Sequence, residues 1–400
     1  MLIKGAKMDW NTLYCPNKGC PYYGIMFQPG KMVKNGSSYG HPQALCRGCG
    51  RSIALNYATA YSGLESEPAI FETAVRALAE GNSIRATGRI LQIDKDTVCD
   101  WLNRAALHCR TVMLYFWCRL HVTECQLDEL WSFVHTKEAH LPFAKIACDT
   151  YGDAWVWLAF APVWRLVLAF VVGKRTQENA DLLLARVKAV TDEHIPFFTS
   201  DQLPEYDDAL LHTYGVWIQP ERKGARGRHP LPRLAPAADL LYAQVVKVRE
   251  HGRMKKVTTK IVFGKPEAIA AQLANSSASD TINTSFVERD NLTQRQSNRR
   301  LTRKSNGFSK DIIWFEKQLW LSMAYYHFVL PHHSLRQPLE TPEQTRGSGS
   351  PRKWLPVTPA VASGMTDHAW ATAELLSYRV PAQFLDQLAT LEPLFALPEE

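Results

Sequence analysis

The sequence has no long apolar run. None of its 400 residues falls in a stretch of roughly 18 consecutive apolar residues, the length that a membrane-spanning helix needs. The most apolar region, residues 154–173, is interrupted by Pro162 and Arg165, so we expect two strands joined by a turn there. The first ten residues carry charge but no apolar core, which predicts no secretory signal. We therefore expect a cytoplasmic protein with no membrane partner.

The chain has only nine cysteines, an odd number and few for its length. We therefore do not expect a disulfide framework. Four of them form two close pairs, Cys15 with Cys20 and Cys46 with Cys49, and 25 residues separate the pairs. This spacing predicts a structural Zn²⁺ site in a zinc ribbon over residues 10–60. Few large aliphatic residues lie there, so the segment needs a metal to fold. The alternative is four unrelated thiols.

The charge balance shows no excess of acid, and the net charge of +7 favours a polyanionic partner. Over residues 66–112 the apolar period becomes helical, as at Phe71, Val75 and Leu78, and Ser83 and Asp94 are placed to cap two further helices. This predicts a helix-turn-helix. Residues at the start of its last helix would then enter a major groove, namely Lys95, Thr97 and Asn103. The alternative is a plain three-helix bundle.

Beyond residue 120 the pattern is mixed. Strands are predicted over residues 122–134, 143–149, 154–160, 165–172 and 196–199, with a turn at 151–153. Helices are predicted over residues 176–192 and after residue 201. Several strands, a helix, a strand and a helix, in this order, indicate an α/β ribonuclease H-like fold.

Three acids have the setting that metal-dependent phosphoryl transfer requires. Asp128 interrupts an apolar strand, Asp201 ends another strand, and Glu288 opens an arginine-rich helix. Carboxylates are hard oxygen ligands that suit Mg²⁺ or Mn²⁺, and two such ions can hold both oxygens of a phosphodiester exchange. Glu129 competes with Asp128, but alternation along a strand places the two on opposite faces. With 39 acids in the chain, three surface residues are the plain alternative.

The motifs that contain these acids resemble a known family. Residues 127–134, Ser200-Asp201 and residues 286–293, continuing through 298–304 and 307–310, are similar to the insertion-sequence DDE transposases of the IS-one type. In that family a zinc ribbon and a helix-turn-helix precede the catalytic core. The family's three acids fall on Asp128, Asp201 and Glu288, and its basic residue seven positions later falls on Arg295.

The resemblance implies an enzyme that binds the terminal inverted repeats of its element, then cuts the DNA and transfers the strand. It implies catalytic Mg²⁺ or Mn²⁺, double-stranded DNA as the partner, a homo-oligomer on that DNA, and a location at the nucleoid. The chain departs from the family in two ways. Asp201 and Glu288 are 87 positions apart, which is long, and the DNA-binding and catalytic parts share one continuous chain.

The long separation predicts a basic β insertion at about residues 220–280 in a catalytic domain spanning 120–330. Residues 221–265 hold twelve Lys or Arg against three acids, which favours a DNA-contacting arm over a solvated loop. Phosphate contacts are also expected from the basic residues after Glu288, and Arg295, Arg299 and Arg303 would share a helical face. The full set is Arg289, Arg295, Arg299, Arg300, Arg303 and Lys304.

Residues 331–352 have the composition of a linker, and residues 353–400 form a C-terminal segment without an assigned role. Two other functions compete with the transposase. One is a catalytically inactive DNA-binding regulator derived from a transposase. The other is a ribonuclease H-like nuclease without strand transfer.

Overall fold

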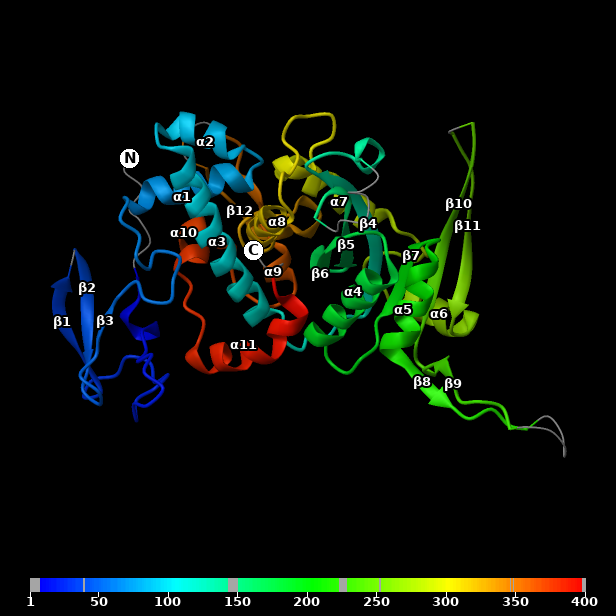
Figure 1. Cartoon of the computed structure of the whole chain (residues 1–400), viewed down its shortest axis with the longest axis horizontal. Coiled ribbons are helices and arrows are strands. Elements are labelled where there is room, and N and C mark those ends of the chain that lie inside the picture. Colours follow the sequence, from blue (N-terminus) through cyan, green and yellow to red (C-terminus); the bar gives the residue numbers. More distant parts are fainter. Residues whose placement is uncertain are drawn as a thin grey trace. The chain divides into compact units, whose positions relative to one another are not determined.

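The computed structural model describes residues 8–38, 40–142, 150–222, 229–251, 253–345, 347 and 349–397. The chain divides into two compact units, and each is mixed in its secondary structure. The terminal unit comprises residues 1–116, 295–307 and 313–400, and the central unit comprises residues 117–294 and 308–312. Figure 1 labels their elements. Within the described ranges, no helix is long and apolar enough to cross a membrane.

The terminal unit begins with a small antiparallel sheet. A 3-10 turn, η1 (Trp10–Thr12), precedes β1 (Met32–Ser38), β2 (His41–Cys46) and β3 (Ser52–Ala54), which pair in the order β1-β2-β3. Its buried cluster contains only a few aliphatic side chains and is completed by three cysteines. So small a core gives little stability without a further cross-link.

Three helices follow: α1 (Pro68–Ala79), α2 (Ile84–Leu91) and α3 (Lys95–Phe116). The predicted caps are confirmed. Ser83 Oγ accepts the Ala86 N–H at 3.1 Å, and Asp94 Oδ1 accepts the Asp96 N–H at 2.7 Å. Gln92 ends α2 in the left-handed conformation, so that the chain turns directly into α3. The expected apolar stripe of α3, from Val98 to Ala105, is buried.

The C-terminal segment folds within the terminal unit. Here α8 (Ile312–Phe328) is buried on nearly every side, and α9 (Pro359–Ala362), α10 (Thr372–Ser377) and α11 (Ala382–Phe395) follow it. The Trp370 ring stacks on both Phe328 and Tyr378, at centroid distances of 4.8 and 5.0 Å. Residues 331–352, expected to be a linker, include η5 (His333–Leu335) and β12 (Gln337–Glu343), which pairs with β13 (Arg352–Leu355).

The central unit is built on a six-stranded sheet (Figure 1). Its strands are β4 (Glu124–Val134), β5 (Gly152–Ala161), β6 (Leu166–Gly173), β7 (Phe197–Asp201), β10 (Tyr242–Glu250) and β11 (Arg253–Phe263), in the order β11-β10-β7-β4-β5-β6. Strands β4, β7 and β10 are parallel, and the other pairings are antiparallel. Parallel neighbours bring their carboxyl ends to the same edge of the sheet.

Helices cover both faces of this sheet. On one face α4 (Gln177–Val190) packs against β5, β6 and α5 (Pro204–Tyr214). On the other face lies α7 (Ser285–Ser297), which side chains of β4 and β7 anchor. The remaining elements are η2 (Glu138–His140), the hairpin of β8 (Gly215–Ile218) and β9 (Arg233–Pro236), α6 (Pro266–Ala274) and, in the terminal unit, η4 (Arg299–Leu301).

Most of the predicted strands and helices of this region are confirmed, with two corrections to their boundaries and one strand outside the description. Gly152 and Asp153 are not a turn, because they pair with Val134 and Phe133 as the first residues of β5. The helix that opens near Glu288 ends at Ser297, so Arg299 and Arg303 do not share its face. The strand predicted over residues 143–149 lies outside the described residues.

The basic insertion also needs a correction. Residues 242–250, expected to form one strand of a hairpin in a DNA-contacting arm, do form the hairpin strand β10 with β11, but the first four residues of β10 also pair with β7 inside the central sheet. Its first four residues, Tyr242 to Val245, are buried. The burial of these four residues was not predicted, because the lysines and arginines that follow them in the hairpin indicated an exposed segment.

Candidate active site and metal centre

Sheet register brings Asp128 and Asp201 together. The parallel ladder of β4 and β7 pairs Gln126 with Thr199 and Leu127 with Ser200. The next positions on the two strands are Asp128 and Asp201, and neighbouring strands lie roughly 4.8 Å apart. Asp201 is the last residue of β7, so its side chain lies at the carboxyl end of that strand.

The third acid is positioned by α7, which two polar side chains fix to the sheet. Gln126 Nε2 donates to the Asn283 carbonyl at 2.9 Å, and Gln126 Oε1 accepts the Val287 N–H, also at 2.9 Å. Thr199 Oγ1 donates to the same Asn283 carbonyl at 3.2 Å. Gln126 and Thr199 each precede one of the aspartates by two residues, so they lie on the same face as the acids. Glu288, in the first turn of α7, is thereby held over Asp201.

A lysine lies between Asp201 and Glu288. Lys247 Nζ donates to Asp201 Oδ1 at 2.8 Å and Oδ2 at 2.9 Å, and it also bonds to Glu288 Oε1. Thr284 Oγ1 lies 3.1 Å from Asp201 Oδ1 and 2.8 Å from Glu288 Oε1. Burial lowers the pKa of Lys247, but its bonds to the two carboxylates outweigh burial, and the pKa is raised overall. Lys247 is therefore a charged ammonium shared by two acids.

Asp128 has a different neighbour. Its Oδ2 accepts a hydrogen bond from Asn291 Nδ2 at 2.6 Å, and its Oδ1 accepts the Glu129 N–H at 2.9 Å. The pKa of Asp128 is raised to about 7, first by burial and then by the negative charges of Glu129, Asp201 and Glu288, while the backbone hydrogen bond from Glu129 opposes the shift. These charge effects show that the three acids share one electrostatic environment.

Glu129 points to the opposite side of β4. It accepts bonds from Arg175 and, at 3.3 Å, from the Tyr206 hydroxyl on α5. Burial raises the pKa of Glu129, and the neighbouring Arg175 partly offsets this. Asp128 is thus the acid that faces α7, and Glu129 ties the strand to the helices on the other face.

Sequence reasoning missed Lys247, Thr284 and Asn291. Asn291 lies one helical turn after Glu288, so the i, i+3 spacing was enough to place both on one face of α7. Lys247 had no comparable signal, because it belongs to a segment rich in basic residues. Only the pairing of β10 with β7 shows that it reaches the acids.

A second cluster, in the terminal unit, is the predicted cysteine set. The Sγ atoms of Cys15, Cys20, Cys46 and Cys49 all lie within 4.8 Å of one another. Cys15 and Cys49 are 3.7 Å apart at sulfur, and Cys20 and Cys46 are 3.6 Å apart. A tetrahedral zinc site with Zn–S bonds of about 2.3 Å requires S···S distances of about 3.8 Å. The four cysteines can therefore hold a metal ion and are compatible with structural zinc.

The backbone around these thiols supports that use. A hydrogen bond from the Arg51 backbone lowers the pKa of the Cys49 thiol to about 6 and favours the thiolate that binds a metal, whereas burial raises the pKa of Cys15 to about 12 and opposes it. The Tyr22 N–H lies 3.3 Å from Cys20 Sγ. A Cβ on Gly48 would lie 2.9 Å from the same sulfur, so this knuckle requires glycine. Among the described residues, no other group of three or more Cys, His, Asp or Glu is as close, so the three acids are more widely spaced.

The predicted DNA-contacting residues lie in three places. Lys95 and Thr97 are in the first turn of α3, and Lys95 Nζ bonds to Asp96 at 2.7 Å. Asn103 is farther along α3 and is half-buried. Arg295 lies in the last turn of α7 and donates to the Leu301 carbonyl at 3.0 Å. After α7, Arg299 and Arg300 are half-buried, whereas Arg303 and Lys304 are exposed.

Basic residues missed by the sequence analysis lie at the turn between α2 and α3. A cavity of about 430 Å³ there is lined by Arg85, Arg89 and Lys95, among others. Arg85 and Arg89 are exposed on α2. Their i, i+4 spacing predicts that they share one face of a helix, but DNA contacts were predicted only for the last helix of the motif.

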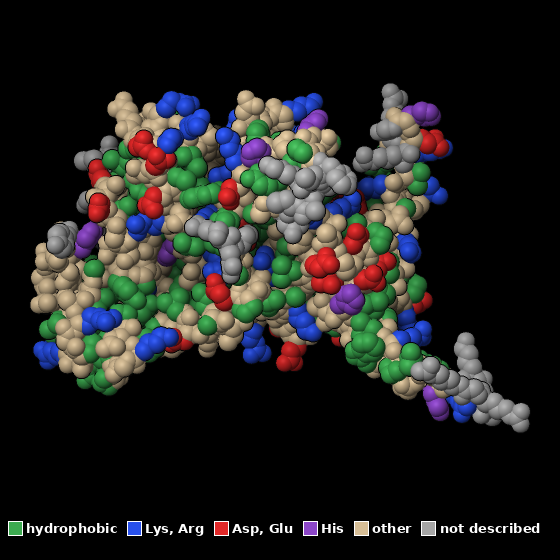
Figure 2. Space-filling model, viewed as in Figure 1, with side chains coloured by type: hydrophobic (Ala, Val, Ile, Leu, Met, Phe, Trp, Pro, Cys, Tyr) green, Lys and Arg blue, Asp and Glu red, His purple; other side chains and the backbone are tan. Residues whose placement is uncertain are grey.

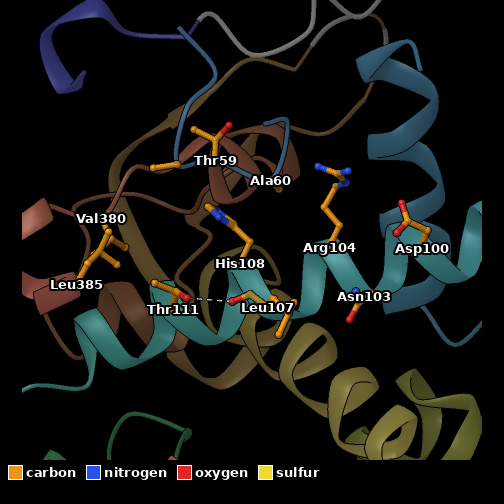
Figure 3. Close-up of a pocket in the computed structure, with 11 residues that line it drawn as sticks. Thr59, Ala60, Asp100, Asn103, Arg104, Leu107, His108, Thr111, Val380 and Leu385 are labelled. Carbon is orange, nitrogen blue, oxygen red and sulfur yellow. Dashed lines mark hydrogen bonds between the residues drawn. The ribbon is translucent and has the colours of Figure 1, made fainter. Parts of the chain in front are cut away.

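A larger cavity of about 460 Å³ is confined to the terminal unit. Six of its lining residues, Asp100, Asn103, Arg104, Leu107, His108 and Thr111, come from α3, and Val380 and Leu385 close it (Figure 3). His108 is engaged with the Leu375 carbonyl at 3.0 Å, and burial lowers its pKa to about 4. The cavity contains none of the three acids.

Charge on the central unit is uneven. Acidic side chains gather over α4 and α5 in Figure 2, where Glu178, Asp181, Glu205, Asp207 and Asp208 lie. This face is the one to which Glu129 points. Like charges repel, so the α4–α5 face is unfavourable for a polyanion.

No protein-family model matches the chain, and no curated protein matches it.

Proposed function

We propose that this protein is a DNA transposase that uses divalent metal to cut the ends of its element and to join them to target DNA. The observation that carries the proposal is the placement of Asp128, Asp201 and Glu288 on the α7 side of the central sheet. The register of β4 and β7 places the two aspartates side by side, and α7 brings the glutamate against one of them. Acids from two neighbouring strands and a facing helix form the set that this chemistry needs.

The central sheet supports the finer fold in the proposal. Three antiparallel strands, β4 to β6, are followed by α4, the parallel strand β7, α5 and then the parallel strand β10. This order, with acids on adjacent parallel strands, is what a ribonuclease H-like domain would have. The terminal unit would supply the zinc ribbon around the four cysteines and a helix-turn-helix in α2 and α3.

The donor set at the acids fits Mg²⁺ or Mn²⁺. Asp201 and Glu288 already share a cation, the Lys247 ammonium, which bonds to both. Asn291 Oδ1, beside Asp128, is buried with no hydrogen-bond partner in the described part of the chain. All these donors are hard oxygens. Asp128, Asp201 and Glu288 would hold the metals, which activate a water or 3′-hydroxyl and neutralise charge on the reacting phosphate.

The other side chains of the site have orienting roles. Asn291 fixes the rotamer of Asp128 through its 2.6 Å bond, and Thr284 fixes Glu288. Gln126 and Thr199 hold the start of α7 against the sheet. Such fixed ligands matter because small displacements of reacting groups cost large factors in rate.

DNA binding would rest on two groups of basic residues, one at the turn between α2 and α3 and one after α7. Arg85, Arg89 and Lys95 flank the turn between α2 and α3, and Arg303 and Lys304 are exposed beyond α7. The net charge of +7 favours association with a polyanion. Each phosphate contact should add about 0.9 to the slope of log affinity against log salt.

The proposal is tested by incubating the protein with Mn²⁺ and linear DNA that carries the sequences flanking its own reading frame. Cleaved ends and joined target products are resolved on a gel for the wild type, Asp128→Asn, Asp201→Asn and Glu288→Gln. Asp208→Asn, an exposed acid on α5, is the matched control. We expect each of the three variants to lose at least about 10³-fold in rate while still binding the DNA, and the control to retain activity.

The competing functions give different results. Cleavage without joined products indicates a nuclease. DNA binding without cleavage by the wild type indicates an inactive regulator and contradicts the proposed enzyme.

A further inference from the structure

Lys247 is in an unexpected place for a lysine. Its side chain is only 17% exposed, and its ammonium lies within 2.9 Å of both oxygens of Asp201. It also bonds to Glu288, and it lies 3.4 Å from Thr284 Oγ1. A lysine that only supplied surface charge would keep its head in water. This one uses its donors on the two acids that the proposed function assigns to metal.

The strand makes the placement rigid. Val245 pairs with Asp201 across β10 and β7, and Lys247 follows two residues later on the same face. On its other side β10 is paired with β11, and Lys247 stands opposite Val257. The lysine stem thus projects from an internal strand beside the aspartate and does not come from a loop.

An ammonium and a divalent ion cannot both occupy this position. Each needs the same lone pairs of Asp201 and Glu288, and two cations this close repel each other in a partly buried site. Without any cation, the two carboxylates would repel each other instead. The ammonium lies between these two carboxylates and compensates their charge.

We propose that Lys247 is the resident cation of the acid site: it holds Asp201 and Glu288 together before metal arrives and must leave them for a divalent ion to bind. This inference rests on the proposed function, because it assumes that the acids bind metal. Lys247 is then a positioning residue that acts through the acids and sets the metal concentration at which the site loads. The divalent ion competes with Lys247 for the two acids. Its binding is weaker because the charge-assisted hydrogen bonds of Lys247 must first break.

The test is a titration of the zinc-loaded full-length protein with Mn²⁺ alone. Binding is measured as the loss of the electron paramagnetic resonance signal of the free ion. Lys247→Met removes the ammonium but keeps a linear side chain. Lys256→Met, an exposed lysine of β11, removes the same charge from the same hairpin. We expect Lys247→Met to bind Mn²⁺ about tenfold or more tightly than the wild type, and Lys256→Met to bind it like the wild type.

Thermal unfolding adds a readout that a purely structural lysine would not give. Lys247→Met should unfold at a lower temperature than the wild type without Mn²⁺, because its acids repel, and should gain more from added Mn²⁺. Equal or weaker Mn²⁺ binding by Lys247→Met overturns the proposal.

A measurement on the wild type covers the case in which Lys247→Met does not fold. Amine-reactive labelling, read by peptide mass spectrometry, should modify Lys247 several-fold faster when Mn²⁺ is saturating, with Lys256 as the internal control. An unchanged rate at Lys247 overturns the proposal. If Asp201→Asn binds Mn²⁺ as the wild type does, the acids are not the metal site, and the proposed function fails as well. If Mn²⁺ binding requires Asp201 but ignores Lys247, only the role of the lysine is lost.

Discussion

At the scale of single residues, the site combines groups that oppose one another. Asp128 is half-buried, and desolvation together with the charges of nearby acids raises its pKa to about 7. Asp201 and Glu288 are joined through Lys247 and Thr284. Arrangements of this kind cost stability and are retained where chemistry needs them. Substitutions at these residues should therefore change the free energy of unfolding and the activity in different directions.

The first prediction concerns Asp128 and pH. Its pKa is raised from 3.8 to about 7, so the folded protein holds a proton that the unfolded chain has released. The stability from this group is present below about pH 4 and is lost as pH rises towards 7. Asn cannot ionise, so without added Mg²⁺ or Mn²⁺ we expect Asp128→Asn to be more stable than the wild type by about 1–3 kcal/mol at pH 8.

At pH 4 the two proteins should have nearly equal stability. Urea unfolding at both pH values measures the difference, with Asp208→Asn as the exposed-acid control. The same difference at pH 4 and pH 8 would show that burial does not hold the proton on Asp128.

At the scale of elements, α7 depends on one side chain of β4. Gln126 satisfies both the Asn283 carbonyl and the Val287 N–H. Gln126→Ala leaves these groups unpaired, so we expect a loss of about 1–3 kcal/mol in the free energy of unfolding and weaker Mn²⁺ binding, because Glu288 loses its support. Gln272→Ala removes a similar bond, to the Thr123 carbonyl at 3.2 Å, but lies on α6. It should leave Mn²⁺ binding unchanged. Equal effects of both variants on Mn²⁺ binding would rule out this role of Gln126.

The small sheet of the terminal unit depends on its cysteines in the same way. Cys46→Ser should abolish stoichiometric zinc, and loss of the metal should unfold this sheet, because its few aliphatic side chains cannot hold it alone. Cys118→Ser, an exposed cysteine outside the cluster, is the control. Zinc content by a colorimetric chelator, together with protease sensitivity of residues 10–60, measures both effects. Full zinc occupancy in Cys46→Ser would contradict the four-ligand site.

Features that depend on neighbouring residues could be predicted from the sequence. Features that depend on the pairing of strands far apart in the sequence could not. Capping residues such as Ser83, and the cysteine spacing, are written in a few neighbouring positions, and the structure places them as predicted. The role of β10 was missed because burial of Tyr242 to Val245 depends on β7, more than 40 positions earlier. Lys247 was missed for the same reason. The end of α7 at Ser297 was missed because the arginines favoured a longer helix.

At the scale of the whole molecule, the two ends of the chain belong to one unit. Arg379, near the C-terminus, is buried and donates to the Tyr57 carbonyl at 2.8 Å, to the Leu55 carbonyl and to Thr12 Oγ1. The C-terminal segment, which had no role in the sequence analysis, thus completes the terminal unit.

Arg379→Ala should destabilise the terminal unit by about 2–4 kcal/mol, because it leaves buried carbonyls without their charged donor. The central unit should be unaffected. Hydrogen exchange by mass spectrometry on the full chain would show faster exchange in residues 10–60 and unchanged exchange in β4 and β7. Faster exchange in both units would mean that the chain unfolds as one cooperative body. Arg336→Ala, a half-buried arginine over the Trp354 ring, is the control.

The central claim is that Asp128, Asp201 and Glu288 bind divalent metal for chemistry on DNA. The most direct measurement is anomalous X-ray scattering from Mn²⁺ in crystals of the protein bound to DNA from its own element. The account predicts manganese within roughly 2.1 Å of oxygens of Asp128 and Asp201, with Lys247 moved away from both acids. Ordered acids without manganese, and with Lys247 still bonded to Asp201 and Glu288, would contradict it.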